Sequence, residues 1–177
     1  MKEISNSVSD ILTRYIILLV SAFPDFWIFY FIFTPLTIYP VYFLLNLFYE
    51  SSLIGNIILV NETAIELIGA CVAGAAYYLL FILNLSVPKI KLQKRIKMIL
   101  FSFVLFLFVN ILRIFLLSII SFLDSSWFDA VHKLFWYFVS TIFVVGIWFL
   151  EVKLFKIKDI PIYSDIKFLY SKSKFSK

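Results

Sequence analysis

The sequence predicts an all-α integral membrane protein with four to five transmembrane helices and a short extracytoplasmic β-hairpin. Of its 177 residues, 63% are hydrophobic and 20% aromatic, whereas soluble domains are roughly 45–50% apolar. Apolar runs near the ~20 residues that cross a bilayer recur along the chain, and basic clusters flank them. We therefore predict one polytopic membrane domain over residues 1–158 and a basic cytoplasmic tail over residues 159–177.

Three apolar runs are long enough to be spans. They cover about residues 65–85, 99–122 and 128–150. A basic loop over residues 88–97 separates the first two runs, and the basic tail follows the third. Because positive charge collects on the cytoplasmic side of a membrane, both basic segments are predicted to be cytoplasmic. The connection between the second and third spans then faces outward.

The region before these spans permits two interpretations. Residues 15–49 are almost continuously apolar but are interrupted by prolines, which kink or end helices. One interpretation is an interfacial or half-inserted helix up to Phe23, followed by one kinked span over about residues 26–49. The other is two spans that meet near Pro35. The charges near the N-terminus nearly cancel, so they do not orient it.

A short outer segment is predicted to form the β-hairpin. Residues 57–60 are β-branched or apolar, Asn61 and Glu62 follow as turn residues, and Ala64 and Ile65 resume the apolar pattern. The hairpin is expected to lie on the outer membrane surface.

Cysteine and histidine counts limit the chemistry. The chain has one Cys and one His, so it forms no intramolecular disulfide, and structural zinc would need about four nitrogen or sulfur ligands. We therefore expect no metal and no cofactor. The basic segments flank apolar spans, which favours contact with anionic membrane lipids over nucleic-acid binding.

Three polar residues, Arg113, Cys71 and His132, are predicted to lie at the same depth near the outer face of the membrane. Arg113 lies about 15 residues along its span, which at ~1.5 Å per residue places it ~22 Å from the inner edge. Cys71 lies about two turns, and His132 about one turn, below the outer ends of their own spans. A lone membrane cysteine is usually only a small buried apolar residue. A buried arginine is usually paired or functional, so the coincidence of all three indicates a site.

Two further residues are expected to support this site. Asn110 precedes Arg113 by three residues on the same helix face, where its amide can hold the guanidinium. Glu66 lies just above Cys71 and is a candidate to orient His132, although an exposed interfacial carboxylate is the simpler interpretation.

These residue types suit cysteine acyl transfer. A nearby cation, Arg113 or protonated His132, favours the Cys71 thiolate that acts as nucleophile. His132 can protonate the leaving amine and later deprotonate an acceptor. Arg113 can alternatively stabilise a tetrahedral oxyanion.

The segments "ACVAGAAYY", "NILRI" and "VHKLFWY", in this order, resemble the exosortase/archaeosortase family of integral-membrane cysteine transpeptidases, especially its short archaeal members. The resemblance covers roughly residues 54–158. It implies Cys71 as nucleophile, Arg113 as the essential cation and His132 as the third catalytic residue. Family members often have Ser or Thr directly after the cysteine and then Gly, whereas here Val72 and Ala73 precede the glycine.

The resemblance also implies a substrate and a reaction. Such enzymes cleave a C-terminal sorting signal of surface proteins, made of a short motif, a hydrophobic helix and a basic cluster. They pass the acyl group to a lipid or another envelope acceptor. The alternative is a non-enzymatic transporter subunit or assembly factor in which Arg113 binds an anionic ligand or a partner helix and Cys71 only packs.

Overall fold

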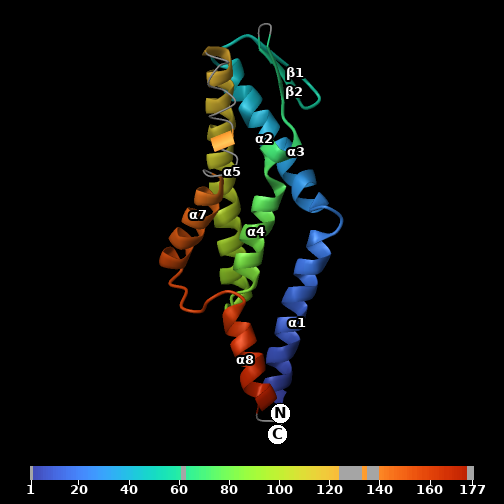
Figure 1. The fold of residues 1–177 in the computed structure, drawn as a ribbon, viewed down its shortest axis with the longest axis vertical. Helices are drawn as coiled ribbons and strands as arrows, with labels where there is room; N and C mark the ends of the chain where they lie inside the picture. The colour runs from blue at the N-terminus through green and yellow to red at the C-terminus, as the bar shows by residue number, and fades with distance from the viewer. Residues whose placement is uncertain (1, 61–62, 124–132, 135–139, 175–177) are drawn as a thin grey trace.

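The protein is an elongated helical bundle with a small sheet at one end (Figure 1). The computed structural model describes residues 2–60, 63–123, 133–134 and 140–174. Both chain termini lie at the end opposite the sheet (Figure 1). The described elements are α1 (Lys2–Ala22), α2 (Trp27–Asn46), β1 (Ser51–Ile54), β2 (Ile57–Val60), β3 (Thr63–Glu66), α3 (Gly69–Val72), α4 (Gly74–Leu85), α5 (Leu92–Leu123), α7 (Ser140–Leu154) and α8 (Tyr163–Lys174).

The first two helices separate at the Pro24 turn. Asp25 and Phe26 there have φ values of 47° and 59°. The next helix, α2, continues through Pro35 and Pro40 without a break. A helix up to about Phe23 and a single helix after it are therefore confirmed as α1 and α2, and two helices meeting near Pro35 are not observed. A proline in an apolar helix is tolerated where neighbouring groups take over the backbone carbonyl that it leaves free.

The predicted hairpin is present and is extended by a third strand. β2 pairs antiparallel with β3, with Ile57 opposite Glu66, and β1 adds to the other edge of β2. Ile58 and Val60 of β2 are buried and pack against α2 and α5. The β1 segment is too short and too polar at its start to be recognised from the sequence.

Two described helices, α2 and α5, are long and apolar enough to cross a bilayer. The run predicted over residues 65–85 is shorter as a helix, because Ile65 lies in β3 and the helix begins at Gly69. The run predicted from residue 99 is longer, because α5 already begins at Leu92 and includes part of the basic loop. Of the third predicted run, most of residues 128–139 lie outside the described residues, and α7 forms its second half.

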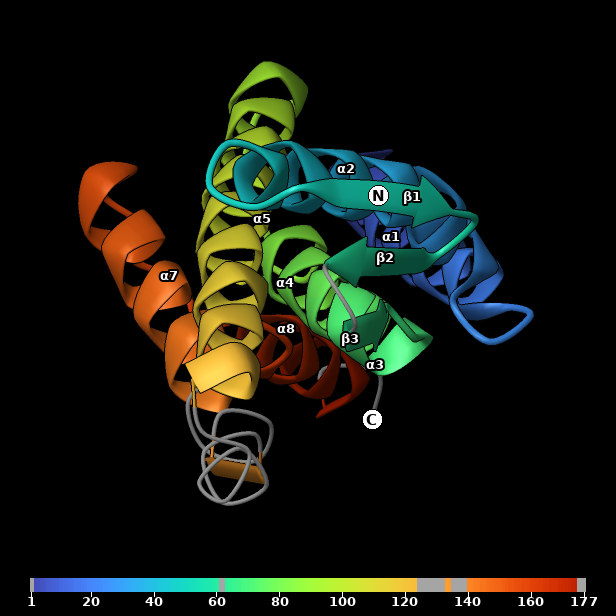
Figure 2. The same cartoon turned by 90° about the horizontal axis from the view of Figure 1, so that it is seen from above.

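The core is aromatic and lies between α2, α4 and α5. The rings of Phe33 and Tyr77 stack with centroids 3.5 Å apart, and Phe106 meets Tyr77 edge-on at 4.8 Å. Aromatic pairs of this kind favour offset or edge contacts and stabilise the packing of the helices that carry them. Viewed along the long axis, α7 covers α5 on the side away from α1 (Figure 2).

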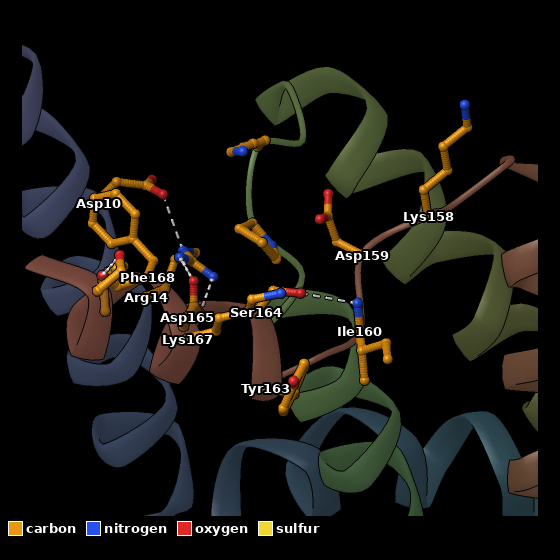
Figure 3. A pocket seen from close by; sticks show the side chains of 14 residues that line it. Asp10, Arg14, Lys158, Asp159, Ile160, Tyr163, Ser164, Asp165, Lys167 and Phe168 are labelled. Atoms are coloured by element: carbon orange, nitrogen blue, oxygen red, sulfur yellow. Dashed lines mark hydrogen bonds and ion pairs between the residues drawn. The ribbon is translucent and has the colours of Figure 1, made fainter.

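The end of the chain forms α8, which the sequence patterns did not predict. Arg14 of α1 donates to both carboxylate oxygens of Asp165 on α8, each at 2.9 Å, and both side chains are buried. Both line a cavity of about 670 Å³ (Figure 3). This two-point ion pair fixes α8 beside α1 at the end of the molecule where the termini lie (Figure 1).

Candidate active site

Cys71 lies in a helix that breaks two residues later. Ala73 takes left-handed backbone angles (φ 59°, ψ 44°), and its N–H donates to Gly69 O at 3.0 Å. This conformation costs an L-residue roughly 1–2 kcal/mol, so the surrounding packing must hold it. The break ends α3 after one turn, and α4 begins at the next residue, Gly74.

The lack of a side chain at Gly74 lets α2 approach this break. A Cβ atom built there would lie 2.7 Å from the Tyr30 ring. Since real contacts of this kind do not come below 3.0 Å, any larger residue at this position would displace the ring. Gly74 therefore belongs to the packing that fixes the backbone beside Cys71.

Asn110 crosses from α5 to the broken helix. Its Nδ2 donates to Cys71 O at 2.9 Å and to Val72 O at 3.4 Å. Carbonyls at the end of a helix have no partner within the helix, so this amide satisfies them. The predicted role of Asn110 was to hold the Arg113 guanidinium; its observed hydrogen bonds instead fix the backbone of the candidate nucleophile.

Arg113 is buried one turn further along α5. It is 5% exposed, and its guanidinium donates to Ser140 Oγ at 2.7 Å. Its Nε has no hydrogen-bond partner among the described residues. Ser140, the first residue of α7, was not predicted, because a serine at the edge of an apolar run is too common to mark a site.

The Cys71 thiol is half-buried and packs against the cluster that contains Ile114. The charges of Arg113 and of Glu66 both act on it. Glu66 lies at the exposed end of β3. Burial of the thiol opposes the thiolate most strongly and Glu66 also opposes it, whereas Arg113 favours it.

His132 lies outside the described residues, so the structure does not describe its geometry relative to Cys71. Cys71, Asn110 and Arg113 are brought together where α3 meets α5. No family model, no curated protein and no solved structure matches this chain. Within the described ranges, no group of three His, Cys, Asp or Glu side chains is placed to hold a metal ion.

A second buried polar cluster lies toward the other end of the bundle. Asn84 of α4 donates through Nδ2 to Glu151 Oε2 of α7 at 3.1 Å and to Ser102 Oγ of α5 at 3.3 Å. All three residues are 0% exposed. Among the described residues, Asn84 Oδ1 and Glu151 Oε1 have no partner. This cluster was not predicted, because Glu151 directly follows the expected third span and so looked like a surface residue.

Proposed function

We propose that this protein is an outward-facing membrane cysteine transpeptidase or peptidase, with Cys71 as nucleophile. The observation that carries the proposal is geometric. Asn110 donates to Cys71 O at 2.9 Å at a helix break, and one turn further along α5 Arg113 is buried with an Nε that has no partner among the described residues. A buried arginine beside a half-buried thiol favours the thiolate, which is the reactive form. The resemblance to exosortases and archaeosortases supports the same assignment.

The proposed reaction has two steps. Cys71 Sγ attacks the scissile carbonyl carbon, and the C–N bond breaks to leave a thioester, while His132 donates a proton to the leaving amine. An acceptor then attacks the thioester carbonyl carbon and gives its proton to His132. The C–S bond breaks, and the Cys71 thiolate is released. Arg113 Nε, which is buried and has no partner among the described residues, is a donor available to the oxyanion of either tetrahedral intermediate.

The proposal includes a membrane topology. The four proposed spans are α2, α3 and α4 together, α5, and the apolar run that ends in α7. The helix α1 runs along the long axis of the molecule beside α4 (Figure 1), so it is placed as a half-inserted helix. Exposed apolar side chains near its C-terminal end, such as Leu19 and Val20, support this partial insertion. Residues 88–97 and the C-terminal tail then face the cytoplasm, and Cys71 lies toward the outer face.

The proposed substrates are surface proteins that end in a short motif, a hydrophobic helix and a basic tail. The test compares the C-termini of surface proteins, by mass spectrometry, in cells that carry wild-type protein or Cys71→Ala. We expect a set of proteins to keep the hydrophobic helix and basic tail only in the variant. Arg113→Lys should also impair processing, since lysine lacks the planar donor pair.

A matched control is Ser118→Ala, which changes a buried hydroxyl on the same helix as Arg113. This variant should leave processing unchanged. Normal C-termini in cells with Cys71→Ala or Cys71→Ser, at wild-type protein levels, would contradict the proposal.

A second candidate function is a non-enzymatic one, in which Arg113 binds an anionic ligand or a partner helix. The buried Nε without a partner among the described residues favours it equally. Thiol reactivity separates the two. A catalytic Cys71 should react at neutral pH with a small reagent applied from outside, and more slowly in Arg113→Gln, whereas an inert thiol would favour the binding function.

A further inference from the structure

The third strand of the sheet has one edge that no described strand occupies. The strand order is β1-β2-β3, so β3 pairs with β2 on one side only. Figure 2 shows β3 at the side of the sheet next to α3, the short helix that carries Cys71. A strand edge presents a row of backbone N–H and C=O groups that can pair with another extended chain.

The register shows which residues face this open edge. Leu67, directly after β3, donates its N–H to Asn56 O at 2.9 Å, on the side of β2. In an antiparallel ladder, alternate residues of a strand bond to the same neighbour. The backbone groups of Ala64, Glu66 and Ile68 therefore face away from β2. All three residues are exposed, and no other segment among the described residues is hydrogen-bonded to Ala64 or Glu66.

The open edge leads to the Cys71 thiol. Ile68 continues the extended backbone of β3 (φ −79°, ψ 169°) and directly precedes α3. Its backbone N–H donates to the Cys71 thiol. Because this N–H faces the open edge, the sulfur lies in line with the backbone groups of Ala64 and Glu66. A strand added at this edge would therefore run onto the candidate nucleophile.

The position of α3 sets the direction of such a strand. α3 lies between the sheet and the middle of the molecule (Figure 1), so a chain that follows β3 towards Cys71 moves from the outer end towards the proposed bilayer. The proposed substrate has its short motif before its hydrophobic helix, so it passes Cys71 in the same direction. It runs parallel to β3. At ~3.3 Å per residue, about four of its residues span the edge from Ala64 to Ile68.

We propose that the open edge of β3 binds the recognition motif of the substrate as an added parallel strand, which brings the scissile carbonyl carbon to Cys71 Sγ. In this mode of peptide recognition, main-chain hydrogen bonds give affinity, and side chains beside the edge give selectivity. The inference rests on the proposed function and deepens it, because it assigns the extended segment directly before the scissile bond to a defined part of the fold.

Ala64→Pro tests the edge while sparing the sheet. Proline removes the N–H that faces outward, and it is tolerated in an edge strand where that N–H does not bond to the neighbouring strand. In cells with this variant, we expect cleavage of surface proteins, measured by mass spectrometry of their C-termini, to fall at least about fivefold, since main-chain hydrogen bonds to the substrate are lost. Reaction of Cys71 with iodoacetamide should keep the wild-type rate.

The matched control is Ser51→Pro, at the opposite edge of the sheet. Ser51 of β1 lies opposite Val60, whose backbone groups face β3, so the Ser51 N–H also points away from β2. This variant removes the same kind of donor from an edge that does not lead to Cys71. Cleavage should therefore stay at the wild-type level.

Photo-crosslinking keeps the inference testable if Ala64→Pro fails to fold. p-Benzoylphenylalanine replaces Glu66 at the open edge or, as a control, Ser52 on β1, in a chain that also carries Cys71→Ala so that substrate stays intact. We expect the probe at position 66 to capture uncleaved proteins that end in a hydrophobic helix and a basic tail. The probe at position 52 should capture none of them.

Two outcomes would overturn the inference and leave the proposed function standing. One is wild-type cleavage in Ala64→Pro, and the other is equal capture of uncleaved proteins from positions 66 and 52. Unchanged C-termini in cells with Cys71→Ala would instead contradict the proposed function, and the inference with it. The two failures are therefore distinguishable.

Discussion

At the scale of single residues, the region around Cys71 depends on side chains that permit an unusual backbone. Ala73 is left-handed, Asn110 caps the carbonyls of Cys71 and Val72, and Gly74 accommodates Tyr30. The position and orientation of the thiol relative to Arg113 follow from these contacts. A small change next to the cysteine should therefore affect the site without altering any candidate catalytic group.

Gly74→Ala tests this dependence. The added methyl would lie 2.7 Å from the Tyr30 ring, so the ring or the start of α4 must move. Overpacking of this kind typically costs about 1–3 kcal/mol. We expect a lower thermal unfolding midpoint in detergent and slower reaction of Cys71 with small thiol reagents.

The matched control is Gly146→Ala on α7, where an added Cβ meets nothing within 4 Å. Removing this helical glycine should leave the midpoint unchanged or raise it, because alanine favours the helix by about 1 kcal/mol. Combining Gly74→Ala with Tyr30→Ala should recover part of the thiol reactivity. Equal unfolding midpoints for the two glycine variants would show that the Tyr30 contact does not constrain the break.

At the scale of elements, the sequence predicts those helices and strands whose formation depends on the local pattern of apolar residues. Hydrophobic runs predict α2, α4 and α5, and the β-branched run predicts the hairpin. The break at Ala73 was not predictable, because "ACVAGAAYY" reads as continuous small and apolar helix. It depends on tertiary contacts from Asn110 and Tyr30, which no local pattern encodes.

Prediction of the buried polar residues has the same limit, because some of them are buried only by tertiary contacts. The sequence singles out Cys71, Asn110 and Arg113 as candidates because polar residues in apolar runs are rare. It did not identify Ser140 or Glu151, which lie at the ends of apolar runs, where polar residues are ordinary. Their role becomes apparent only when α7 packs against α4 and α5.

The cluster of Asn84, Ser102 and Glu151 should determine how firmly α7 joins the bundle. Asn84→Leu would leave the buried Glu151 carboxyl without its amide donor, which costs about 1–3 kcal/mol. Glu151→Gln keeps a hydrogen-bonding group of the same size, so we expect little loss or a gain in stability. Denaturant unfolding in detergent measures both changes.

The double variant Asn84→Leu/Glu151→Leu serves as the control, because it removes both polar groups together. It should be more stable than Asn84→Leu alone, since no buried carboxyl is then left without its donor and Ser102 Oγ keeps its hydrogen bond to Ile99 O. If Asn84→Leu unfolds at the wild-type denaturant concentration, the cluster does not hold α7 in place.

At the scale of the whole molecule, one ion pair brings the two ends of the chain together. Arg14 and Asp165 are 151 residues apart in sequence and are both buried, whereas Asp10, which binds the same arginine, is 58% exposed. An exposed pair contributes about 0–1 kcal/mol, but removing one partner of a buried pair leaves an uncompensated charge. The attachment of α8 should therefore depend on Asp165 and hardly on Asp10.

Hydrogen exchange of the α8 amides in detergent measures this attachment. Arg14→Leu should raise exchange in α8 at least about tenfold relative to wild type, because it leaves Asp165 buried without its partner and favours local opening. Asp10→Asn, the matched control, should leave α8 exchange unchanged. Wild-type exchange in Arg14→Leu would mean that the ion pair with Asp165 does not hold α8 against α1.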